Sequence, residues 1–284
     1  MSTLTTPSPS PSPATTAALA SLPVHRQRLT SLARAEWTKM RSVRSTMWTI
    51  ATMIVITLGI ATIASATIAS RWSTFSPIQQ ATFDPTKISL RGLLFSQLII
   101  GVLGVLVMSA EYGTGTIRAS LSAVPRRARV LVAKAAVFTV VAFVVSEVLA
   151  FGAFFIGQSL LTSPAPHAVL SQPGVLRAVV GGGLVVTVLG LLALGLATII
   201  RHSAGAITAY VGVLLVAPII LQALPSSVGQ PILRYMPFTI SDTMTSPTAH
   251  ASSAFSPWVG FAVLVVYALV ALGIGGWLLV RRDA

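Results

Sequence analysis

Six long apolar runs dominate the pattern of hydrophobic and polar positions along the chain. A helix needs roughly 20 apolar residues to cross about 30 Å of hydrocarbon, and each run meets or approaches that length. The runs are continuous rather than alternating, and they far exceed the roughly ten residues of a barrel strand. The pattern therefore predicts an all-α integral membrane protein with six transmembrane helices, at residues 47–69, 93–110, 135–160, 178–200, 204–224 and 258–280.

The residues before the first run divide into two parts. Residues 1–24 are rich in Ser, Thr, Pro and Ala, and we expect them to form a disordered tail. Their polar tract precedes the basic residues, which is unlike a signal peptide, so the first run should remain as an anchor. Residues 25–46 predict an amphipathic helix at the membrane interface, with an apolar stripe of Leu29, Leu32, Trp37, Met40 and Val43.

One charged residue does not fit this amphipathic pattern. The helical wheel places Glu36 inside the apolar stripe, whereas Arg41 points away from it. A local ion pair with Lys39 or a nearby Arg would explain Glu36. The alternative is a contact with the cytoplasmic ends of the spanning helices or with a partner protein.

Composition and charge support the membrane assignment and set its orientation. Apolar residues make up 54% of the chain and charged residues only 9%, far fewer than in a soluble domain. Of the 19 Lys and Arg residues, fourteen fall on one side of the predicted bundle and five on the other, at Arg71, Lys87, Arg91, Arg177 and Arg234. Positive residues in short loops stay on the cytoplasmic side, so both termini should be cytoplasmic. This topology, with attraction to anionic lipid, explains the net charge of +13 without nucleic-acid binding.

The loop between the second and third runs, residues 111–134, is the clearest candidate for a docking site. Glu111 ends the second run, Gly113 and Gly115 permit a sharp turn, and Thr116 is one of two residues able to cap a short helix. That helix would run through Arg118 and Leu121 and stop at Pro125. The basic residues of the loop are explained by orientation alone, but the turn and helix are not. We therefore expect the turn and the helix to contact a partner.

Few polar side chains fall inside the predicted spans. Glu147 lies near the middle of the third span, Gln158 follows on nearly the same face, and Gln97 lies in the second span. An ionised, unpaired carboxylate in the bilayer costs several kcal/mol, so Glu147 should be protonated, paired or in a wet cavity. The three residues either line a translocation path or lock helices together by hydrogen bonds.

Two segments in this order and spacing resemble a known family. AEWTKMRSVRSTMW before the first span and SAEYGTGTIRASLSAVPRRARVLVAK after the second are similar to the permease subunits of ABC type-2 exporters, in the form common among high-GC Gram-positive bacteria. The resemblance covers nearly the whole chain after the tail. It implies a connecting helix that includes Glu36, Trp37, Lys39 and Arg41. It also implies that Glu111, Gly113, Gly115, Thr116, Arg118, Leu121 and Pro125 belong to a coupling loop that rests on an ATPase subunit.

The resemblance carries further expectations about assembly and cofactors. Two permease subunits, identical or different, would pair with two ABC ATPases in a bacterial plasma membrane. ATP and Mg would bind the ATPase, since this sequence contains no Gly-x-x-x-x-Gly-Lys loop. The extracellular segment, residues 225–257, would carry short re-entrant helices, for which residues 231–244 are the candidate. A surface loop with chance apolar residues is the alternative.

These observations and the resemblance predict a membrane subunit, not an enzyme, that moves a hydrophobic or amphipathic substrate. The outward direction is implied by the resemblance alone. We expect neither catalytic residues nor a metal site, because the four His are scattered outside the spans and Cys is absent. A membrane scaffold or sensor built on the same architecture is an alternative. A proton-coupled transporter that uses Glu147 is another, although nothing suggests two inverted halves.

Overall fold

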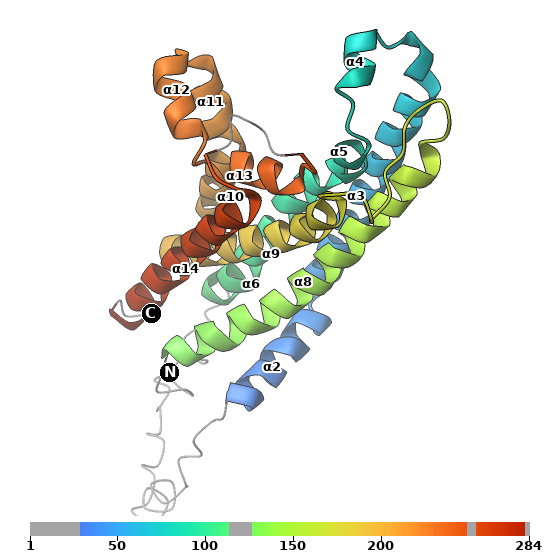
Figure 1. Ribbon diagram of the computed structural model, residues 1–284. Coiled ribbons are helices and arrows are strands. Elements are labelled where there is room, and N and C mark those ends of the chain that lie inside the picture. The colour runs from blue at the N-terminus through green and yellow to red at the C-terminus, as the bar shows by residue number, and fades with distance from the viewer. Residues whose placement is uncertain (1–28, 114–126, 249–253, 282–284) are drawn as a thin grey trace, which may run out of the picture.

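The computed structural model describes residues 29–113, 127–248 and 254–281, and these residues form helices and connecting turns without a strand (Figure 1). Six helical segments in this part of the chain are long and apolar enough to cross a membrane, which confirms the prediction from hydropathy. They are Arg44–Thr74, Pro85–Ser109, Ala128–Leu160, Val175–Ile200, Ser203–Ala223 and Pro257–Arg281.

The first two helices meet at a single extended residue. α2 (Leu29–Ser42) ends before Val43, whose φ of −81° and ψ of 117° interrupt the helix, and α3 (Arg44–Arg71) begins directly after it. The break falls four residues before the predicted start of the first span at residue 47. The polar residues at 44–46 therefore belong to the spanning helix rather than to the amphipathic one.

A short helical excursion links the first and second spans. It comprises η1 (Trp72–Thr74), α4 (Pro77–Ala81), α5 (Pro85–Ser89) and η2 (Leu90–Gly92), which leads into α6 (Leu93–Gly113). The Asp84 side chain accepts hydrogen bonds from the backbone of Thr86 and Lys87, and Pro85 occupies the first turn of α5. This cap and the fixed φ of proline start a helix at residue 85, ahead of the apolar run at 93.

The third span is also longer than its apolar run. α8 (Arg127–Leu160) contains 34 residues, so residues 127–134 of the predicted loop form the first turns of this helix. At the other end of the loop, α6 continues through residues 111–113. Arg and Lys are good helix formers, so α8 can begin at Arg127, before its apolar part.

The remaining spans surround one central helix. α9 (Val175–Ile200) packs against α6, α8 and α14 (Pro257–Arg281), and most of its residues are buried. Small residues make this packing close: a Cβ at Gly104 of α6 would overlap the carbonyl oxygen of Gly190 in α9. The core of the protein therefore lies along α9.

The fifth span is interrupted by a wider helical turn. It consists of α10 (Ser203–Val211), a π-helical turn at Gly212–Val216 and α11 (Ala217–Ala223), which has Pro218 in its first turn. Proline cannot donate a backbone hydrogen bond, and the wider turn precedes it. α12 (Ser226–Leu233) and α13 (Pro237–Thr245) follow, so two short helices lie in the segment where short helices were expected.

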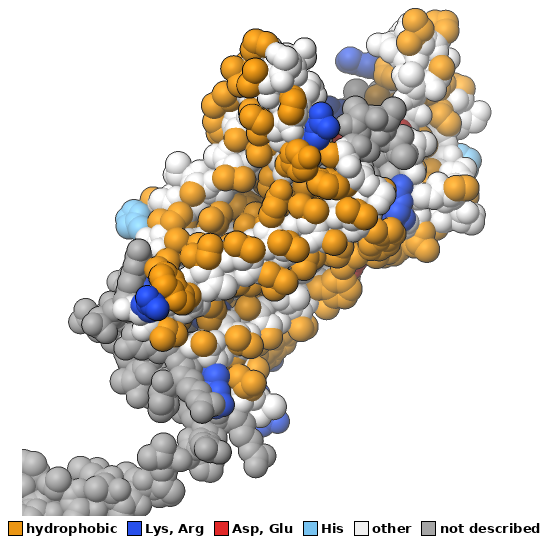
Figure 2. Space-filling view, turned by 60° about the vertical axis from the view of Figure 1, so that its left-hand side comes forward, with side chains coloured by type: hydrophobic (Ala, Val, Ile, Leu, Met, Phe, Trp, Pro, Cys, Tyr) orange, Lys and Arg blue, Asp and Glu red, His pale blue; other side chains and the backbone are white. Residues whose placement is uncertain are grey.

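The outer surface of the bundle suits a lipid environment. Large apolar side chains such as Trp48 and Val55 of α3 and Leu269 of α14 are exposed. Figure 2 shows hydrophobic side chains over most of one face, with Lys and Arg side chains toward its ends. In Figure 1, α2 lies at one end of the bundle, whereas α4 and α12 lie at the other. The two ends therefore carry different structures.

Candidate coupling site and polar helix contacts

Glu36 is buried where α2 meets the third span. Its side chain is 7% exposed, and each carboxylate oxygen accepts a hydrogen bond from a lysine. Lys39 Nζ lies 3.0 Å from Oε1, and Lys134 Nζ, from α8, lies 2.6 Å from Oε2. The Lys134 side chain is itself only 3% exposed. The structure thus places Glu36 both in a local pair and in contact with a spanning helix.

The rest of α2 shows which face is turned inward. Met40 is buried beside Glu36, whereas Trp37, Lys39 and Arg41 are exposed. A cavity of about 220 Å³ lies next to the Glu36–Lys134 pair, with Met40, Leu103, Leu106 and Val107 among its apolar lining residues. The inward face therefore includes Glu36 and Met40, as the helical wheel predicted, but it excludes Trp37.

The predicted docking residues lie largely outside the described part of the chain. The structure does not describe residues 114–126, and this range includes Gly115, Thr116, Arg118, Leu121 and Pro125. Glu111 and Gly113 belong to the last turn of α6, but the positions of their side chains are likewise outside the description. The described helices do show where the loop is attached: it leaves α6 at residue 113 and enters α8 at residue 127, seven residues before Lys134.

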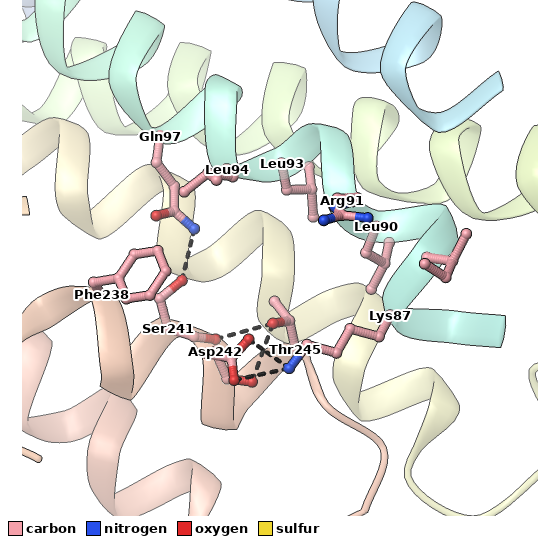
Figure 3. A pocket seen from close by; sticks show the side chains of 11 residues that line it. Lys87, Leu90, Arg91, Leu93, Leu94, Gln97, Phe238, Ser241, Asp242 and Thr245 are labelled. Carbon is pink, nitrogen blue, oxygen red and sulfur yellow. Dashed lines mark hydrogen bonds and ion pairs between the residues drawn. The ribbon is translucent and has the colours of Figure 1, made fainter. Parts of the chain in front are cut away.

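Gln97 joins three helices. Its Nε2 donates to Ser241 Oγ of α13 over 2.6 Å (Figure 3). Its backbone carbonyl accepts from the Tyr210 hydroxyl of α10 over 2.7 Å. Gln97 is 4% exposed, and its Oε1 has no hydrogen-bond partner within the described residues. One residue therefore connects α6 to both α13 and α10.

Gln158 makes a separate set of bonds at the end of α8. Its Nε2 donates to the carbonyl of Pro85 over 2.9 Å and to Ser89 Oγ over 2.8 Å, and its Oε1 accepts from the backbone N–H of Ala168 over 2.6 Å. These bonds fasten α8 to α5 and to the segment that follows α8. Both the nitrogen and the oxygen of the Gln158 side-chain amide are therefore hydrogen-bonded.

Glu147 lies on α8 against α9. A Cβ added at Gly183 would lie 2.6 Å from the Glu147 carboxyl carbon, so the glycine makes room for this side chain. Its Oε1 is buried and has no hydrogen-bond partner within the described residues. Within the described residues, no hydrogen bond joins Glu147, Gln97 and Gln158 to one another. The three residues thus occupy separate environments.

Two cations that the sequence did not single out hold α13 in place. Lys87 of α5 pairs with Asp242, with Nζ 2.8 Å from Oδ1. Arg177, in the first turn of α9, donates to the carbonyls of Met244, Ser246 and Pro247 at 2.8 to 3.2 Å. One sequence signal could have identified them. The chain has only six acidic residues, and only five of its Lys and Arg residues fall on the predicted extracellular side, so each charged residue there is uncommon.

The described residues contain no group of three or more His, Cys, Asp or Glu side chains placed to hold a metal ion.

A family model described as ABC-2 family transporter protein matches residues 32–218, which is well over half of the chain. The match begins within α2 and ends within α11. No curated protein matches the chain.

Proposed function

The chain belongs to the ABC-2 transporter family and is a multi-pass membrane permease, and we propose that it works as the membrane subunit of an exporter driven by a separate ABC ATPase. In this proposal a hydrophobic or amphipathic substrate moves outward across a bacterial plasma membrane. The ATPase binds ATP and Mg. A second permease subunit, identical or different, completes the assembly.

The observation that carries this proposal is the buried contact of Glu36 with Lys134. Lys134 follows the 114–126 segment by only two helical turns, and Glu36 belongs to α2. A partner that pushes on the segment would therefore move α8 and α2 together rather than one helix alone. A buried ion pair with short distances is a stiff link, because separating its charges in an apolar site is costly.

The orientation of the permease follows from charge and exposure. α2 lies at the end of the bundle that carries most of the Lys and Arg residues, which supports a cytoplasmic location for both termini. Its exposed Trp37 and Arg41 suit the headgroup boundary, so α2 is proposed as the interfacial connecting helix. The segment from residue 111 to 134 then faces the cytoplasm, where an ATPase can reach it.

The apolar surfaces of the outer helices leave room for a second permease. The fifth span and α3 are among the least buried of the six spans. Only 22% and 17% of the residues in their most apolar stretches are buried. Six helices seldom enclose a path for a large amphiphile, so a path between two subunits is the simpler arrangement.

The test is ATP turnover by the complete complex. The chain is co-purified with its candidate ATPase, reconstituted in lipid, and compared with Glu111→Ala, Gly115→Pro and Glu36→Gln. All three variants should bind the ATPase but lose the change in turnover that the permease causes. Arg281→Gln is the matched control, since Arg281 is a cytoplasmic-side cation that stacks on Trp277 instead of contacting α2. Normal coupling in both loop variants would show that this segment is not the docking site.

A further inference from the structure

A cavity of about 440 Å³ lies between α13 and the α5–η2–α6 segment (Figure 3). This size is within the range of small-molecule sites in proteins. One part of its wall is apolar and includes Leu90, Leu93, Leu94 and Phe238. Another part is polar and includes Lys87, Arg91, Gln97 and Asp242. A molecule that fits such a wall must itself be amphipathic.

The charges of the cavity do not cancel. Lys87 and Asp242 neutralise each other through their ion pair. Arg91 is exposed, and within the described residues its guanidinium makes no hydrogen bond or ion pair. The described lining therefore carries one uncompensated positive charge. An anionic group, and in particular a phosphate or carboxylate able to accept two guanidinium hydrogen bonds, is the complement.

Gln97 is a buried polar residue of the cavity wall. Figure 3 shows its side chain extending from α6 toward α13 across the cavity. It is 4% exposed, yet its Oε1 lacks a partner within the described residues. A buried amide oxygen without a hydrogen bond costs about 1–3 kcal/mol. Gln97 lies six residues beyond Arg91, about 9 Å along the helical segment.

We propose that this cavity is a binding site for an amphiphile with one phosphate-type anionic head group, placed at Arg91, and an apolar chain along Leu93, Leu94 and Phe238. The site lies at the end of the bundle opposite α2, which the proposed orientation makes the outer end. The inference rests on the proposed exporter function and names its substrate class: an anionic amphiphile held near the outer surface before release. A bilayer phospholipid offers the same chemistry, and the experiment separates the two sources.

The test measures binding of dodecyl phosphate to the purified, fluorescently labelled chain in phosphatidylcholine nanodiscs by thermophoresis. Dodecyl phosphate should bind, and Arg91→Gln should weaken its affinity about tenfold, as expected for a lost charge-assisted hydrogen bond. Arg91→Lys should recover part of the affinity. Arg71→Gln is the matched control, because Arg71 is exposed at the same end but does not line the cavity.

A second variant and a second ligand guard against nonspecific attraction. Leu94→Trp should fill the cavity and reduce binding without removing a charge, and zwitterionic dodecylphosphocholine should bind more weakly than dodecyl phosphate. Equal affinity in wild type and Arg91→Gln, or equal affinity for the two ligands, would overturn the proposal. Loss of dodecyl phosphate binding in phosphatidylglycerol nanodiscs would assign the cavity to bilayer lipid and overturn its assignment to the substrate.

This experiment does not involve the ATPase. A permease that binds dodecyl phosphate through Arg91 but fails to couple to an ATPase would contradict the proposed function and leave the site intact. A permease that couples normally but binds the anion no better than Arg91→Gln does would contradict the site alone.

Discussion

At the residue scale, the buried carboxylate of Glu36 forms ion pairs with two lysines that differ widely in exposure. Lys134 is 3% exposed and Lys39 is 47% exposed, although both lie within hydrogen-bonding distance of Glu36. An exposed pair contributes about 0–1 kcal/mol because water screens it. Removal of a buried partner leaves an unpaired charge and costs about 3–5 kcal/mol. The two lysines should therefore differ sharply on substitution.

Lys134→Met should lower the thermal unfolding temperature of the purified chain in neutral detergent much more than Lys39→Met does. The reason is that Met keeps the length of the side chain but removes the charge facing Glu36. The exchanged pair Glu36→Lys with Lys134→Glu should recover part of the loss. Similar unfolding temperatures for the two single variants would show that the buried pair does not stabilise the fold.

Glu147 presents a different case at the same scale, because its carboxylate faces the close backbone of Gly183. Glu147→Gln keeps the shape and avoids the cost of a charge in the bilayer. We expect this variant to fold and to transport like the wild type, whereas Glu147→Ala should be less stable because it leaves a cavity. Transport assays with expression controls distinguish these outcomes. Loss of transport in Glu147→Gln would instead favour a proton-coupled mechanism.

At the element scale, α13 is held by three separate polar contacts. These are the Lys87–Asp242 pair, the Gln97–Ser241 hydrogen bond and the Arg177 bonds to the carbonyls at its C-terminal end. α12, in contrast, packs mainly on α11. The two short helices should therefore differ in local stability, since opening of α13 requires loss of bonds to charged groups.

Arg177→Met should speed hydrogen exchange of the backbone amides of residues 239–246 by at least about tenfold, because it removes three bonds from a charged donor. Exchange in α12 should stay unchanged. Arg234→Met is the matched control, since Arg234 is exposed on the short linker before α13. Equal exchange in α13 for both variants would contradict the clamping role of Arg177.

The elements also show which features a sequence can predict. The six spans follow from local composition, because twenty apolar neighbours have few alternatives. α4 had a readable signal as well: Ser76 and Gln79 form a capping box and Pro77 begins the helix. Lys39 is three residues from Glu36, and its ion pair with Glu36 was predicted from this spacing. The distant partners Lys134 and Ser241 had no local signal. Lys134 is 98 residues from Glu36 and Ser241 is 144 residues from Gln97, so only the packing of whole helices brings them together.

At the scale of the whole molecule, the absence of cysteine offers a direct test of orientation. Single cysteines are introduced at Ser42, at the end of α2, and at Ser73, between α3 and α4; both positions are exposed. In intact cells an impermeant maleimide should label Ser73→Cys and should label Ser42→Cys only after permeabilisation. The parent chain gives the background. The reverse labelling pattern would place α2 outside and contradict the proposed coupling to a cytoplasmic ATPase.

One helix reaches both ends of the molecule. Lys134 and Gln158 lie 24 residues apart on α8, about 36 Å along a continuous backbone whose hydrogen bonds resist stretching. Lys134 is bonded to α2, and Gln158 is bonded to α5, which borders the 440 Å³ cavity. α8 therefore joins these two contacts through one uninterrupted helix. We expect a tilt of α8 beside α2 to shift its contact with α5 as well.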